Sequence, residues 1–129
     1  MYSHMMIGSN NLTRSKTFYD ALFGAVGGAP ATIDELGRLF YMHNGSMFVV
    51  TKPINGAPAS FGNGSTIGFA INSPAQVDAW HKAGVGHGGT SIEDLPGVRD
   101  SMLGDLYLAY LRDPDGNKLC ALHQMATAG

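Results

Sequence analysis

An internal repeat restricts the possible folds of this sequence more than any other feature. Asn10 and Asn72 are 62 residues apart, and so are Phe18 and Trp80. Both pairs occupy matching places in a pattern that runs from a strand through a helix to further strands. We therefore expect two copies of one supersecondary unit in this chain.

The first copy occupies residues 1–52 and is predicted to contain a strand, a helix and three more strands. Asn11 or Thr13 can accept a hydrogen bond from a free N–H group at the start of the helix, and Gly24 is expected to end it. Apolar residues recur at helical spacing between these two ends. The strands are expected at 3–9, 26–33, 36–43 and 46–51.

The second copy occupies residues 65–124 and follows a connector, 53–64, that is rich in glycine, proline and asparagine. Ser73 and Pro74 are predicted to begin its helix, since proline is favoured at the first helical position. We expect a loop at 94–105, long enough to act as a lid, as an insertion relative to the first copy. The strands are expected at 65–71, 87–93, 106–111 and 118–123.

A turn sequence, Asp113-Pro-Asp-Gly-Asn117, separates the last two of these strands and predicts a hairpin. Pro114 fixes φ at the entry, and Gly116 tolerates the positive φ of a tight reversal. Asp115 is expected to hydrogen-bond its own backbone. The final strand is thereby placed, and the side chains that it turns inward decide whether a metal can bind.

Composition limits the classes of partner. A chain of 129 residues with 44% hydrophobic residues can bury the core of one domain, which we assign to residues 1–129. Charged residues make up 14% and the net charge is −2, with no basic run, so neither a nucleic-acid nor a membrane partner is expected. The single cysteine and the lack of a long apolar segment favour a reducing, cytoplasmic location. A small-molecule ligand fits this composition.

The sequence resembles the vicinal oxygen chelate superfamily, which holds glyoxalase I, bleomycin-resistance proteins and extradiol dioxygenases. The resemblance rests on His4-x-x-Ile-Gly-Ser-Asn-Asn-Leu-x-x-Ser-x-x-Phe-Tyr19, on Asp113-Pro-Asp-Gly-Asn117 and on the repeat. It implies an α+β fold in which two βαβββ modules form an open, curled mixed barrel around a cavity. It also implies a homodimer.

Relatives that use a metal hold it with side chains on the first and fourth strands of each module. The resemblance places these positions at His4, Val49, Thr66 and Cys120. Only His4 suits the role, because valine has no donor atom, threonine is a weak ligand and a thiolate prefers soft ions. We therefore expect no cofactor, with a divalent Zn, Ni, Mn or Fe ion at His4 as the alternative.

The same alignment gives a set of candidate ligand-binding residues. Arginines can bind a carboxylate or phosphate bidentately, and one of the two tyrosines before the hairpin is expected to face the cavity. Methionine and valine supply an apolar lining. The candidates are His4, Arg38, Met47, Val49, Thr66, Arg99, Tyr107, Tyr110 and Cys120.

Two functions are compatible with these residues. The first is a metal-free protein that binds a small, largely apolar or aromatic molecule in the cavity. The alternative is a metal-dependent lyase, isomerase or dioxygenase of the glyoxalase type, with His4 as a ligand or general base. The weak donor set favours the first, or an enzyme that works without a metal, and a metal centre of Cys120 and His4 is a weaker third alternative. The sequence does not name the ligand.

Overall fold

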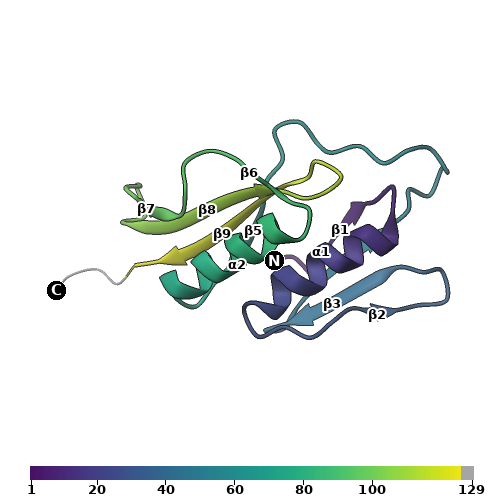
Figure 1. Cartoon of the computed structure of the whole chain (residues 1–129), viewed down its shortest axis with the longest axis horizontal. Coiled ribbons are helices and arrows are strands. Elements are labelled where there is room, and N and C mark those ends of the chain that lie inside the picture. The colour runs from purple at the N-terminus through teal and green to yellow at the C-terminus, as the bar shows by residue number, and fades with distance from the viewer. Residues whose placement is uncertain (126–129) are drawn as a thin grey trace.

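The computed structural model describes residues 1–125 and shows two modules of the same construction lying side by side (Figure 1). Module one runs through β1 (His4–Gly8), α1 (Leu12–Gly24), β2 (Thr32–Ile33), β3 (Leu39–His43) and β4 (Ser46–Thr51). Module two runs through β5 (Ile67–Ala70), α2 (Pro74–Gly86), β6 (Thr90–Ser91), β7 (Gly97–Arg99), β8 (Leu106–Arg112) and β9 (Lys118–Gln124). The fold is α+β, as predicted.

Each module has its own sheet, and the two sheets have matching topologies. The first has the order β1-β4-β3-β2, and the second has the order β5-β9-β8-β6 with β7 also paired to β8. In both sheets the first strand runs parallel to the last one, β1 beside β4 and β5 beside β9, while the other pairs are antiparallel. The two sheets form open, curled layers, and the described residues do not close them into a barrel.

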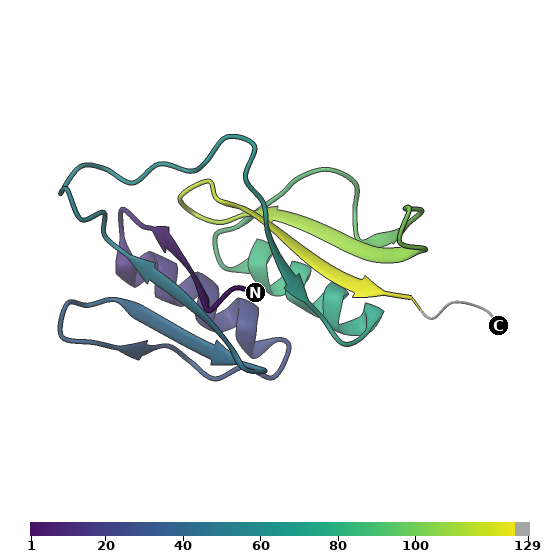
Figure 2. The same ribbon diagram turned by 180° about the vertical axis from the view of Figure 1, so that it is seen from behind.

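Both helices lie on the same side of the two sheets, and the view from behind shows the sheets in front of them (Figure 2). One hydrophobic core fills the space between helices and sheets and includes residues of both modules. Aromatic rings connect the modules within it: the Phe69 ring lies 5.4 Å from that of Phe23 and 5.5 Å from that of Phe48.

The helix boundaries follow from the residues that cap them. The Asn11 side chain accepts a hydrogen bond from the Arg14 N–H at 3.0 Å, and the Ser73 hydroxyl accepts one from the Gln76 N–H at 3.2 Å. Pro74 is the first residue of α2, as predicted. The last strand is also where the hairpin places it, with Gly116 at φ 92°.

Three sequence predictions of strands and loops are wrong. The strand expected at 26–33 is only β2, because Val26 is buried just after α1 and Gly27, at φ 87°, turns the chain. The strand expected at 87–93 is only β6, since Gly88 has a φ of 105°. The expected loop 94–105 contains the short strand β7, which extends the sheet beside β8.

Candidate functional site

Strand alternation in module one turns several candidate residues to the face of the sheet that is opposite α1. Phe48 and Val50 of β4 point into the core, so Met47, Val49 and Thr51 point to the other face. The parallel register places His4 beside Met47, and Met6 beside Val49. We call the face of each sheet that is turned away from α1 and α2 the open face.

A groove of about 810 Å³ lies on the open face of module one, where β1 and β4 end. Its floor includes Met6, Gly8 and Thr51, and the connector that follows β4 forms a wall. Arg38 and Lys52 add positive charge to a lining in which apolar side chains are frequent. The other lining residues are Ile7, Leu36, Pro53, Ile54, Asn55, Pro58, Ala59 and Ser60.

A second, smaller groove of about 460 Å³ lies where β1 meets module two. It shares Met6 and Gly8 with the first groove, and Thr66 and Lys118 line its module-two side. The volumes of both grooves fall in the range of small-molecule sites. The two grooves together form a candidate binding surface that runs across the sheet edges.

The open face of module two carries a small apolar cluster that is separate from the main core. Leu106, Leu108 and Cys120 form it, and Tyr110 packs against it. Burial raises the pKa of the Cys120 thiol, which keeps it protonated at neutral pH. Its surroundings favour an apolar lining residue over a nucleophile.

Lys118 connects this cluster to the rim of module two. Its Nζ atom lies 5.0 Å from the centre of the Tyr110 ring and 2.6 Å from Glu93 Oε2. A cation above an aromatic face is attracted by the ring. The ammonium group is therefore held over the open face, where Glu93 balances its charge.

The structure distinguishes the two tyrosines of β8. Tyr110 lies on the open face, next to Cys120 of β9. Tyr107 lies on the opposite face and packs against the main core, and its hydroxyl donates to Asp78 Oδ1 on α2 at 2.8 Å. Alternation along one strand produces this difference, and it removes Tyr107 from the candidate surface.

The two candidate arginines are each held by nearby groups. Arg38 Nε donates to Asp34 Oδ2 at 2.6 Å, so its charge is partly balanced within the loop before β3. Arg99 on β7 donates through Nη2 to the carbonyl oxygens of Asp94 and Leu95, at 3.1 and 3.0 Å. Arg38 lines the larger groove, whereas Arg99 lies in module two and lines neither groove.

The four positions of the superfamily's metal chelate do not offer a suitable donor set here. His4 is exposed, and its Nδ1 atom is hydrogen-bonded to the Ser3 hydroxyl at 2.7 Å. Val49 is fully buried hydrocarbon, Thr66 is exposed, and burial raises the pKa of the Cys120 thiol. Among residues 1–125 no three His, Cys, Asp or Glu side chains are grouped to hold a metal. These residues do not fit an oxygen-rich divalent site.

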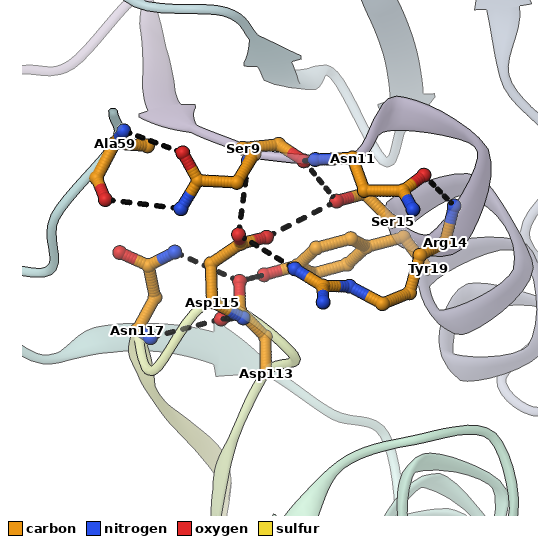
Figure 3. Close-up of polar contacts among 10 residues, drawn as sticks. Ser9, Asn11, Arg14, Ser15, Tyr19, Ala59, Asp113, Asp115 and Asn117 are labelled. Atoms are coloured by element: carbon orange, nitrogen blue, oxygen red, sulfur yellow. Dashed lines mark hydrogen bonds and ion pairs between the residues drawn. The ribbon is translucent and has the colours of Figure 1, made fainter. Parts of the chain in front are cut away.

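The two motifs that carry the family resemblance meet at the junction between the modules (Figure 3). Asp115 Oδ1 accepts hydrogen bonds from the Asn10 N–H and from Arg14 Nη2, both at 2.9 Å, and the Ser15 hydroxyl donates to its other oxygen at 3.3 Å. Asp115 therefore binds the first turn of α1, where a negative charge is favoured, instead of its own turn as predicted.

Asp113 makes the local contacts that the sequence analysis assigned to Asp115. Its Oδ1 atom accepts from the backbone N–H groups of Asp115 and Asn117, at 2.9 and 2.8 Å, and its Oδ2 atom accepts from the Tyr19 hydroxyl at 2.5 Å (Figure 3). An aspartate before a turn is well placed for such backbone bonds. These motifs therefore join the modules and do not line either groove with their carboxylates.

Sequence reasoning missed the connector as part of the candidate site. Residues 53–60 supply the wall of the larger groove. The Asn10 side chain helps to hold this wall: its Oδ1 atom accepts a hydrogen bond from the Ala59 N–H at 2.7 Å, and its Nδ2 atom donates one to the Ala59 carbonyl at 3.1 Å. Ile54, a large apolar residue among the prolines, was the one feature of the sequence that could have indicated this role, since a linker needs no such side chain. In the structure Ile54 is exposed.

Comparison with known proteins identifies the family. A family model described as the Glyoxalase/Bleomycin resistance protein/Dioxygenase superfamily matches residues 2–121. The chain belongs to this superfamily. No curated protein gave a match.

Neither helix in the described part of the chain is long and apolar enough to cross a membrane.

Solved structures extend this result. A glyoxalase/bleomycin resistance protein from Albidiferax ferrireducens T118 is 56% identical, with a TM-score of 0.93, over 96% of this chain and 99% of that one. A glyoxalase-related enzyme from Fulvimarina pelagi is 20% identical, with a TM-score of 0.73, over 96% of this chain and 88% of that one. A lactoylglutathione lyase from Agrobacterium tumefaciens is 19% identical, with a TM-score of 0.67, over 95% and 92%. The last two show the shared fold.

Proposed function

We propose that this protein binds a small, largely apolar or aromatic molecule on the open face, without the divalent metal used by other members of its superfamily. The observation that carries the proposal is the larger groove, which combines an apolar floor and wall with a few polar groups. Small-molecule sites commonly have this composition. The donor set at the four chelate positions supports binding without a metal.

The charges at the groove favour a ligand with one negatively charged or strongly polar end. Arg38 and Lys52 line one side of the groove, and Lys52 has no ion-pair partner among the described residues. Met6 is 43% exposed at the floor, so a bound molecule would cover apolar surface there. The aromatic or aliphatic part would contact Met6, with the polar end near the two cations.

We also propose that the functional unit is a homodimer in which a second copy covers the open faces. Met6 and Met42 are 43% and 71% exposed on the open face of module one. Exposed apolar surface of this kind favours association. Sedimentation at micromolar concentration should give a dimer, and a monomer would contradict this part.

The free Cys120 agrees with a reducing, cytoplasmic location.

A titration with an aromatic anion tests the binding proposal. The fluorescent probe 8-anilinonaphthalene-1-sulfonate should bind at the groove, and Met6→Gln should weaken its binding about tenfold because it replaces apolar contact with an amide. Met102→Gln is the matched control, since Met102 is 99% exposed and lies outside both grooves. Equal affinities for the two variants would contradict the proposed site.

An activity assay separates this proposal from the metal-dependent alternative with His4. The hemithioacetal of methylglyoxal and glutathione, supplied with Ni, Zn, Mn or Fe, should not be isomerised above the uncatalysed rate. Metal-dependent turnover that His4→Gln abolishes would establish the alternative and overturn the metal-free proposal.

A further inference from the structure

The start of module one carries a row of soft metal ligands across three neighbouring strands. His4 of β1 is paired in register with Met47 of β4, and Met47 is paired with Met42 of β3. All three side chains point to the open face, because Phe48 and Tyr41 at the alternate positions point into the core. One imidazole and two thioethers therefore stand side by side.

The spacing of the strands allows these groups to reach one ion. Neighbouring strands are about 4.8 Å apart, so His4 and Met42 start about 10 Å from each other with Met47 between them. Imidazole and methionine side chains are long enough to lean toward the middle strand, and methionine is flexible about three bonds. Within the described residues His4 Nε2 has no hydrogen-bond partner, which leaves it available as a ligand.

The exposure of these methionines argues against simple gap-filling in a core. Met42 is 71% exposed and Met47 is half-buried, and neither belongs to the main hydrophobic core. The row borders the larger groove at Met6, two residues along β1 from His4, and the groove extends from there to Gly8, about 13 Å from His4. His4, Met42 and Met47 themselves line neither groove.

We propose that His4, Met42 and Met47 form a binding site for a soft monovalent cation, Cu(I). Thioether sulfur and imidazole nitrogen suit Cu(I), whereas the oxygen ligands that harder divalent ions prefer are missing from this row. Met6 lies on the same face, two residues after His4 in β1. It is a diagonal neighbour of Met47 and offers a further thioether. This site does not depend on the proposed binding of an organic molecule.

Anaerobic competition with the Cu(I) chelator bicinchoninate tests the site. The wild-type chain should remove one Cu(I) per chain from the chelator complex. Met42→Leu and Met47→Leu should each weaken this binding by more than about tenfold, since a ligand contributes at least as much as the groups that orient it. Leucine keeps the size and apolar character of the side chain, so the fold should tolerate both variants.

Two control variants and a second readout make the result decisive. Met102→Leu alters an exposed methionine elsewhere, and Cys120→Ser removes the only thiol; both should bind Cu(I) like the wild type. In proton–carbon NMR spectra, adding Ag(I) as a redox-inert analogue should shift the methyl signals of Met42 and Met47 but not that of Met102. Failure of the wild type to compete, or loss of binding in Cys120→Ser with full binding in both leucine variants, would overturn the proposal.

Discussion

Replacing Tyr19 with phenylalanine should weaken the junction between the two modules while leaving the shape of the core intact. The Tyr19 hydroxyl is buried and donates to Asp113 Oδ2 at 2.5 Å, which joins α1 of module one to the β8–β9 turn of module two. The substitution removes only the hydroxyl group. The exposed area of the ring and its packing should not change.

The structure gives the size of this effect. A hydrogen bond to a charged group contributes about 1.5–3 kcal/mol, and Asp113 would keep three other donors, two from backbone N–H groups and one from Asn117 Nδ2. We therefore expect Tyr19→Phe to lower the free energy of unfolding by about 2 kcal/mol. Urea unfolding followed by circular dichroism measures this difference.

Tyr41→Phe is the matched control. The Tyr41 hydroxyl also donates to a carboxylate, Asp20 Oδ1 at 2.8 Å, but this contact lies within module one and is only part-buried. Its loss should cost about 1 kcal/mol or less, because water can replace the hydroxyl. A Tyr19→Phe variant within about 0.5 kcal/mol of the wild type would refute the junction as a source of stability.

Two further predictions concern packing and pH. Gly84→Ala should destabilise the fold by about 1–3 kcal/mol, because a Cβ atom there would press on Leu111 and Leu22. Gly86→Ala is the control: its Cβ atom meets no atom within 4 Å, so thermal unfolding should show no change or a gain in stability. Burial raises the pKa of the Tyr19 hydroxyl in the folded protein, and the negative charge of Asp113 raises it further. Above pH about 10 the hydroxyl therefore ionises in the unfolded chain but not in the folded one, so the free energy of unfolding should fall as pH rises. Tyr19→Phe should reduce that fall by about 1.4 kcal/mol per pH unit, measured by urea unfolding at several pH values.

The repeat and the turn residues allowed most of the fold to be predicted. The capping residues of both helices and the β8–β9 hairpin follow from local chemistry, and the structure confirms them. The boundaries of the short strands did not follow. β2 and β7 are edge strands that form because a neighbouring strand offers hydrogen bonds. No pattern in the local sequence predicts such pairing.

The candidate site was predictable only where strand alternation decides it. In the structure, alternation puts Met47, Val49 and Cys120 on the open face, and the register of β8 separates Tyr107 from Tyr110, which the sequence left undecided. The connector wall and the contact of Asp115 with α1 arise from tertiary packing between distant segments. Such contacts have no signature within a short stretch of sequence.

Binding without a divalent metal can be tested by the metal dependence of ligand affinity. The dissociation constant for 8-anilinonaphthalene-1-sulfonate should be measured by fluorescence on the wild-type protein, first with EDTA and then with Ni, Zn or Mn in excess. We predict the same dissociation constant in every condition, because the chelate positions offer only His4 as a good ligand. Binding that EDTA abolishes and one equivalent of such a metal restores would contradict it.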